Sequence, residues 1–203
     1  AYATSMAYTA DSRAVILEAG KLLFMQEGFR GISMRQIAEA VGVTKAALYY
    51  HFKDKEELFV AIVEEYLVAM STMIDEVTSS GLDTRTQIAE LVRRILAQPP
   101  EQRSIIRLAS QELSNVSPEN RARFLEMYHS RFIGRITALL ETGMARGDLR
   151  TMNPNIATWT LLGMMYPYFH PAPPSQALPT ETVVDELLAI YLDGLASPSY
   201  LVS

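Results

Sequence analysis

The stretch ISMRQIAEAVGVTKAALYYHFKDKEELF, residues 32–59, determines the fold more clearly than any other part of this 203-residue chain. Ser33 and Gln36 have the spacing of a capping box, in which each side chain accepts an amide hydrogen bond at the start of a helix. Gly42 is the centre of a three-residue turn, and Thr44 follows as the expected N-cap of the next helix. The pattern therefore predicts two short helices joined by a turn, which is the arrangement of a helix-turn-helix motif.

The second of these helices has one apolar face and one face suited to DNA. Leu48 and Phe52 are four residues apart, so they share a face and are expected to point into the protein. Lys45 and Ala46 lie elsewhere on the helix, where a cation can meet guanine or phosphate and a methyl group can meet thymine. In helix-turn-helix proteins this helix enters the major groove. Tyr50 and His51, and the nearby residue Lys55, have polar tips that suit phosphate oxygens.

The charge distribution gives modest support for a nucleic-acid partner. The whole chain has a net charge of −5, but residues 1–60 are balanced, with 7 basic and 7 acidic residues. Residues 33–55 contain 4 basic and 2 acidic side chains. An acidic protein can bind DNA when one face concentrates positive charge.

Composition excludes several other classes of protein. The chain is 49% apolar and 20% charged, as expected for a packed soluble protein, and it has no cysteine. A disulfide framework, a thiolate zinc site and a cysteine nucleophile are therefore excluded. The three histidines are scattered, so we expect no metal site and no cofactor. No apolar stretch approaches the ~20 residues of a membrane span, and no secretory signal precedes Met6, a candidate natural first residue. A cytoplasmic protein is the expectation.

The rest of the chain also predicts helices, because apolar residues recur at steps of three and four. Gly28 is expected to end the first helix, and a long fourth helix is expected to run from about residue 54 to 81. Further helices are expected near residues 84–98, 101–113, 117–147, 153–169 and 180–195, with a rigid proline-rich loop at 171–179. The fold class is therefore all-α, with about nine helices.

The segment from about Val15 to Phe59 resembles the N-terminal DNA-binding domain of the tetracycline-repressor (TetR/AcrR) family of bacterial transcriptional regulators. The resemblance extends through the capped helix, the Gly-Val-Thr turn and the run LYYHFKDKEEL. It covers about a quarter of the chain, and the remainder is similar only in the number and length of its helices. The resemblance implies an N-terminal three-helix DNA-binding domain, residues 1–56, and a C-terminal helical domain, residues 57–203, for effector binding and dimerisation.

The resemblance also implies how such a protein works. The last two helices of each subunit would form a homodimer that binds double-stranded DNA at a near-palindromic operator, with half-sites ~34–36 Å apart. A small effector in the C-terminal domain would release the protein from DNA. The family's DNA contacts fall on Thr44, Lys45, Ala46, Tyr49, Tyr50, His51 and Lys55, with Ser33 and Arg35 as weaker candidates. Other interpretations stay open: Thr44 as a cap alone, Tyr49 and Tyr50 as core aromatics, His51 as a helix-end histidine, and Lys55 as a solvated charge.

Effector contacts are harder to assign, because pockets are mostly apolar with a few placed polar groups. We expect a largely hydrophobic effector with a small polar or anionic end. The candidate residues are Met70, Met73, Arg107, Gln111, Tyr128, Phe132, Trp159, Tyr166 and Phe169. For the methionines and aromatics among them, core packing or dimer packing is an alternative role.

Three functions compete at this point. The first is a ligand-responsive transcriptional repressor. The second is a helix-turn-helix regulator without a small effector, which a protein partner controls or which acts as an activator. The third is an all-helical enzyme, but the sequence contains no metalloprotease motif, phosphate-binding loop or supported nucleophile. We therefore expect no enzymatic activity.

Overall fold

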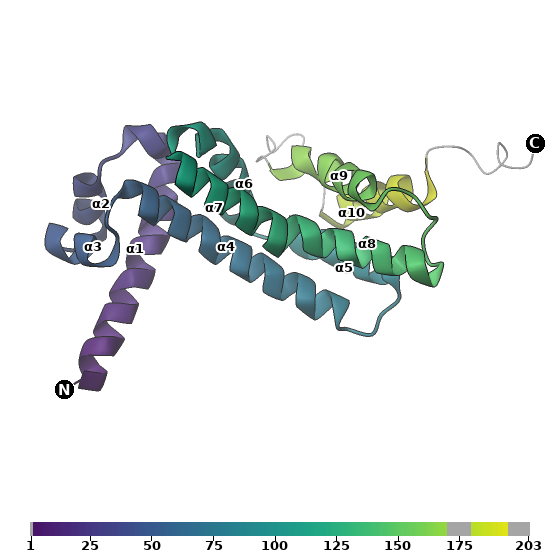
Figure 1. Cartoon of the computed structure of the whole chain (residues 1–203), viewed down its shortest axis with the longest axis horizontal. Helices are drawn as coiled ribbons and strands as arrows, with labels where there is room; N and C mark the ends of the chain where they lie inside the picture. Colours follow the sequence, from purple (N-terminus) through teal and green to yellow (C-terminus); the bar gives the residue numbers. More distant parts are fainter. Residues whose placement is uncertain (1, 170–179, 195–203) are drawn as a thin grey trace, which may run out of the picture. The chain divides into compact units, whose positions relative to one another are not determined.

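A computed structural model describes residues 2–169 and 180–194, without the side chains of residues 2–11 and 101. Within these residues every regular element is a helix, which confirms the all-α fold (Figure 1). The α-helices are α1 (Tyr2–Gly31), α2 (Met34–Val41), α3 (Lys45–His51), α4 (Lys55–Thr78), α5 (Thr84–Leu96), α6 (Pro100–Glu112), α7 (Pro118–Tyr128), α8 (Gly134–Arg146), α9 (Pro154–Met165) and α10 (Thr180–Leu188).

Several expected helix boundaries are confirmed. Ser117 and Asn153 cap α7 and α9, each with proline in the first turn, and Gly28 breaks α1 with a φ of 73°. The helix expected over residues 117–147 is divided into α7 and α8 by a π-helical segment, His129–Ile133. The nine expected helices thus correspond to α1–α10 of the described residues. The loop expected at residues 171–179 lies outside them.

The chain forms two compact units. Unit 1 contains residues 1–69 and 104–129, and unit 2 contains residues 70–103 and 130–203. The expected domain boundary between residues 56 and 57 falls in the first turn of α4, within unit 1, and stays a prediction. None of the helices in the described part of the chain is long and apolar enough to cross a membrane.

An aromatic cluster forms the centre of unit 1. The rings of Phe24, Phe29 and Phe59 lie 5.3–5.8 Å apart, in tilted and edge-on arrangements that favour aromatic packing. Ile37 of α2 and Leu48 of α3 are fully buried. α2 packs against α1 and α3 packs against α2, which leaves the opposite side of α3 to solvent.

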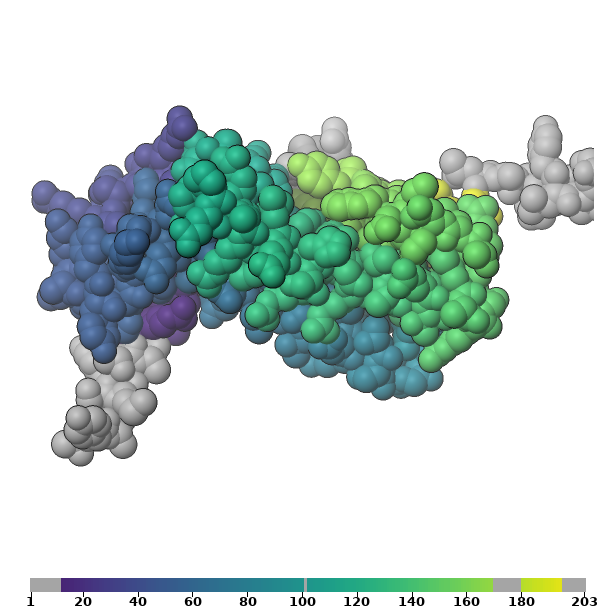
Figure 2. Space-filling model, viewed as in Figure 1, coloured from purple at the N-terminus to yellow at the C-terminus, as the bar shows by residue number. Residues whose placement is uncertain are grey.

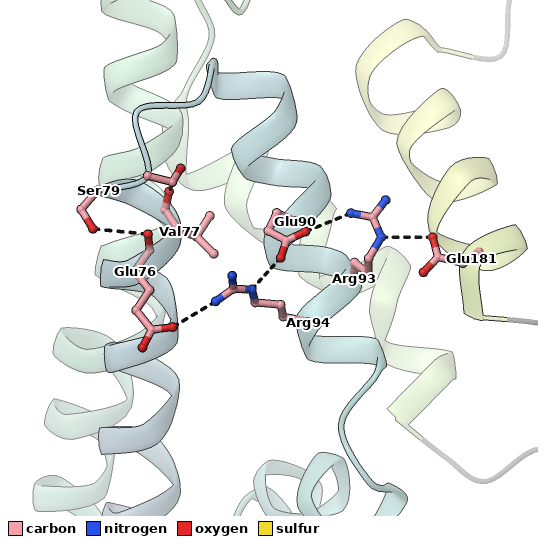
Figure 3. Close-up of polar contacts among 8 residues, drawn as sticks. Glu76, Val77, Ser79, Glu90, Arg93, Arg94 and Glu181 are labelled. Carbon is pink, nitrogen blue, oxygen red and sulfur yellow. Dashed lines mark hydrogen bonds and ion pairs between the residues drawn. The ribbon is translucent and has the colours of Figure 1, made fainter.

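Unit 2 is built on α5, α8, α9 and α10 together with the end of α4 from Met70 onward. Its buried residues include Ile88, Ile136, Leu140, Leu161 and Val184. A chain of ion pairs joins three of its helices (Figure 3). It runs from Glu76 of α4 through Arg94, Glu90 and Arg93 of α5 to Glu181 of α10, with N–O distances of 2.7–3.1 Å. Exposed pairs of this kind contribute about 0.2–1 kcal/mol each.

Candidate DNA-binding site

The capping box predicted at the start of α2 is present. Ser33 Oγ accepts the Gln36 amide at 3.3 Å, and Gln36 Oε1 accepts the Ser33 amide at 3.0 Å. At the other end, Gly42 is left-handed, with φ 75° and ψ 24°, and its amide donates to the Glu39 carbonyl at 3.3 Å. The left-handed conformation of Gly42 ends α2 and turns the chain sharply, so α3 begins only three residues later, at Lys45.

The position of α3 follows from its cap and its apolar face. Thr44 Oγ1 accepts the Ala47 amide at 3.1 Å, which satisfies one of the unpaired amides of the first turn. Leu48 is fully buried and Phe52 almost fully, as the four-residue spacing predicted. The orientation of the helix about its own axis is therefore fixed by these two side chains.

The opposite face of α3 is open to solvent. Thr44, Lys45 and Ala46 are exposed, and Tyr49 and Tyr50 are 44% and 77% exposed. Neither tyrosine is a core aromatic. The segment from α2 to α3 forms part of the molecular surface, drawn in blue in Figure 2. Five of the predicted DNA contacts are thus on one short, accessible segment.

Two predicted contacts, His51 and Lys55, are bound within the protein. His51 is half-buried, and its Nε2 lies 2.8 Å from Ser12 Oγ of α1 in a shared hydrogen bond. Lys55 Nζ donates to the Ile32 carbonyl at 2.8 Å and lies 4.5 Å from the centre of the Phe29 ring. Burial lowers the pKa of Lys55. Both side chains hold the motif together within the chain, and their contact with DNA stays a prediction.

The two weaker candidates also have partners on α2. Ser33 is the N-cap described above. Arg35 is exposed, and its Nε donates to Glu39 at 2.8 Å one turn along the helix. The hydrogen bond and charge of Glu39 raise the pKa of Arg35. An exposed pair of this kind is weak, so the guanidinium can exchange it for a phosphate at little cost.

Three of the predicted effector contacts lie in unit 1. Arg107 Nη1 donates to Gln111 Oε1 at 3.1 Å, and the buried Nε of Arg107 has no hydrogen-bond partner among the described residues. Tyr128 stacks on Phe124 with 5.7 Å between ring centres, and burial raises the pKa of Tyr128 to about 12. The pair formed by Arg107 and Gln111 is thus brought together as a polar group within α6.

The other predicted effector contacts lie in unit 2 and divide into three environments. Met70 and Phe132 are buried in the core, and Met73 and Phe169 are half-buried. Trp159 and Tyr166 are each 53% exposed. The rings of Tyr166 and Phe169 lie 6.4 Å apart. The role of these six residues as effector contacts stays a prediction.

Among the described residues of unit 2, two hollows can be assigned lining residues. One, of about 350 Å³, is lined by residues that include Met144, Met152, Met164 and Tyr191. The other, of about 270 Å³, lies beside Gln87 on α4, α5 and α8. None of the nine predicted effector contacts lines either hollow. In the described part of the chain, no group of three or more acidic or histidine side chains could hold a metal ion.

The fold and the exposed face of α3 define a helix-turn-helix regulator. Residues 16–62 match the family described as "Bacterial regulatory proteins, tetR family", and residues 81–195 match the "Tetracyclin repressor-like, C-terminal domain". The chain therefore belongs to the TetR family of bacterial transcriptional regulators.

Individual relatives agree with this assignment. The HTH-type transcriptional repressor KstR2 of Rhodococcus jostii is 27% identical over 187 residues, which cover 92% of each chain. The structure of the TetR-family regulator PfmR from Thermus thermophilus has a TM-score of 0.77 and 25% identity, and the match covers 90% of this chain and 99% of that one. AibR, solved in complex with isovaleryl coenzyme A and operator DNA, has the same fold, with a TM-score of 0.74, 21% identity and coverage of 88% and 97%.

Proposed function

We propose that this regulator is a ligand-responsive repressor that binds a near-palindromic operator as a homodimer through the exposed face of α3. The observation that supports this most directly is the division of α3 into two faces. Leu48 is buried while Lys45, Ala46 and Tyr49 face solvent. If α3 enters the major groove with this face, Ala46 lies near the base edges and the Lys45 ammonium lies near the phosphates.

Dimerisation through the last two helices is supported by an apolar stripe on α9. Ile156, Trp159, Gly163 and Tyr166 follow one another at steps of three and four residues, so they share a face. Three of them are large side chains that are more than half exposed. A Cβ atom added at Gly163 would meet nothing within 4 Å in this subunit, which leaves room for a close partner helix. Trp159 and Tyr166 therefore suit a dimer contact better than an effector contact.

An effector with an anionic end is supported by Arg107. Its buried Nε lacks a hydrogen-bond partner among the described residues, and an unpaired buried donor is unfavourable. A carboxylate or phosphate would satisfy it. AibR, which shares the fold, was solved with an acyl coenzyme A. Native mass spectrometry of dimer purified under mild conditions tests this: an empty dimer favours the regulator without a small effector.

A footprint on the DNA upstream of the protein's own gene tests the proposed function. We expect a protected, near-palindromic site. The affinity of the protein for this site should fall steeply as the salt concentration rises, because phosphate contacts release counterions. Lys45→Ala and Tyr49→Ala should each weaken binding while dimer formation and helical circular dichroism stay unchanged. Binding that does not depend on salt, or that survives both substitutions, would refute this assignment of α3.

A further inference from the structure

The first residue of α4 fixes the start of α2. Lys55 Nζ donates to the carbonyl of Ile32, and Ile32 directly precedes Ser33, the N-cap of α2. The ammonium also lies against the ring of Phe29 at the end of α1. A cation over an aromatic face is attracted to it, more so when water is partly excluded. Lys55 therefore ties α4 to the helix-turn-helix motif at a single point.

The next residue, Glu56, turns to a different part of unit 1. Its Oε2 accepts the backbone amide of Ser117 at 3.0 Å and the side-chain amide of Asn120 at 2.8 Å. Ser117 is the N-cap of α7, so the carboxylate stands where the helix dipole favours negative charge. The hydrogen bond from Ser117, followed by that from Asn120, lowers the pKa of Glu56. Glu56 thus holds the start of α4 to the start of α7.

A second carboxylate, that of Glu112, completes the connection. Glu112, the last residue of α6, accepts the amide of Phe29 through Oε1 at 3.4 Å and the side-chain amide of Asn115 through Oε2. Its charge acts on Lys55, raising the pKa of Lys55 against the larger effect of burial. The corner between α6 and α7 is therefore linked to the end of α1 by Glu112 and to the start of α4 by Glu56.

We propose that Glu56 and Glu112 are positioning residues for DNA binding, because they hold the helix-turn-helix motif against the corner between α6 and α7. This inference rests on the proposed DNA-binding face of α3. Lys55 and Glu56 are consecutive residues of one helix, so a shift of the corner at Ser117 displaces both. The displacement reaches α2 through Ile32. Without these bonds a smaller fraction of subunits presents α3 correctly, and the apparent Kd rises by the inverse of that fraction.

Electrostatics alone predicts the opposite change in operator affinity when the carboxylate of Glu56 is removed. Removing a carboxylate from a protein that binds a polyanion should strengthen binding, because repulsion decreases. Loss of a positioning contact should weaken binding and leave the salt dependence unchanged, since no phosphate contact is lost. The direction of the change in affinity therefore separates the two effects.

The test uses the full-length protein and the operator duplex defined by the footprint, with Kd measured by fluorescence anisotropy at several salt concentrations. Glu56→Ala should raise Kd about fivefold or more at every salt concentration, with parallel salt plots. Glu56→Gln keeps an acceptor oxygen and should stay within about twofold of the unmodified protein. The matched control is Glu64→Ala: Glu64 also lies on α4 and pairs with Arg123 of α7 at 2.7 Å. It should likewise stay within about twofold, because exposed pairs contribute little.

Unchanged or tighter binding by Glu56→Ala would overturn the proposal, as would a Glu56→Gln variant that binds as weakly as Glu56→Ala. If Glu56→Ala does not fold, Asn120→Ala removes one of the two bonds to Glu56 and should raise Kd in the same direction; no change there would also overturn it. Lys45→Ala reports separately on the DNA-binding face. If Lys45→Ala binds normally, the proposed function fails whatever the Glu56 variants do.

Discussion

The ammonium of Lys45 lies 5.8 Å from the centre of the Tyr49 ring, one turn further along α3. An exposed cation at this distance from an aromatic face gains about 0.5–1 kcal/mol. Both side chains are exposed, so this contact limits their freedom without burying either. Tyr49 therefore holds the Lys45 ammonium beside the surface that we propose for DNA, which reduces the entropy lost when a phosphate binds it.

This geometry predicts a change in salt dependence when Lys45 is removed. Lys45→Ala should weaken operator binding and reduce the slope of log K against log salt by about 1, since one phosphate contact is lost. Lys53→Ala is the matched control, because Lys53 is exposed just beyond α3 and should be solvated. Anisotropy titrations between low and moderate salt measure both slopes. An unchanged slope for Lys45→Ala would show that its ammonium does not contact phosphate.

The helix-turn-helix motif could be predicted from sequence because its determinants are local. Ser33, Gln36, Gly42 and Thr44 act within four residues of their partners, so the capping box and the turn are visible as short patterns. The buried face of α3 followed from spacing alone. The exposure of Tyr49 and Tyr50 did not follow from the sequence, since spacing does not distinguish a buried core aromatic from an exposed aromatic that binds a partner molecule.

The long-range contacts could not be predicted, because nothing in the sequence pairs residues far apart. Glu56 lies next to Glu57 and 61 positions before Ser117, so its role at the start of α7 has no local signal. The sequence predicts a phosphate contact for Lys55 but gives no sign that its ammonium donates to the Ile32 carbonyl, 23 positions earlier. The helix pattern likewise does not bring Met144 and Met152 together with Tyr191 around the hollow in unit 2.

The ion pairs at the centre of Figure 3 predict a specific loss of stability in acid. Hydrogen bonds from Arg94 first, and then from Arg93, lower the pKa of Glu90 below its ordinary value of 4.5. A group with a lowered folded-state pKa stabilises the fold above its unfolded pKa and loses that contribution as pH falls through its folded pKa. Glu90→Gln should therefore destabilise unit 2 at pH 7 and have progressively less effect below about pH 4.5.

Urea denaturation of the unmodified protein and of Glu90→Gln at a series of pH values measures the difference in their free energies of unfolding. Glu65→Gln provides a control, because Glu65 is an exposed carboxylate on α4 outside the chain of ion pairs. The free energy of unfolding of this control should match that of the unmodified protein throughout. A difference for Glu90→Gln that persisted undiminished at pH 3 would mean that its charge is not the source of the effect.

A close approach between α8 and α5 predicts a clash that a second substitution relieves. A Cβ atom at Gly143 would lie 2.4 Å from Thr84 Cγ2, and both residues are buried. Gly143→Ala should therefore destabilise the protein by about 1–3 kcal/mol, the usual range for overpacking. Thr84→Ser removes the methyl group but keeps the hydroxyl that donates to Asp148 at 2.6 Å. The double variant should recover much of the lost thermal midpoint; simple additivity of the two changes would contradict a steric cause.

The proposed dimer face on α9 predicts that the fluorescence of the single tryptophan changes when the dimer forms. Trp159 is the only tryptophan of the chain and is 53% exposed in one subunit, so its fluorescence should shift to shorter wavelength when a partner covers it. Gly163→Arg adds a large charged side chain where the subunit itself leaves open space. This variant should fold normally but remain monomeric, with red-shifted emission that does not depend on concentration.

Sedimentation and fluorescence over a dilution series measure the dimer equilibrium. Ala122→Arg adds the same side chain at an exposed position of a different helix, α7, and should dimerise like the unmodified protein. Each half-site binds one α3, so a monomeric Gly163→Arg protein should also lose most of its affinity for the full operator. A DNA duplex with a single half-site should be bound equally weakly by Gly163→Arg and by the unmodified protein. A Gly163→Arg protein that still dimerised would move the subunit interface away from this face of α9, because an arginine at the centre of a close helix contact cannot be accommodated without separating the two helices.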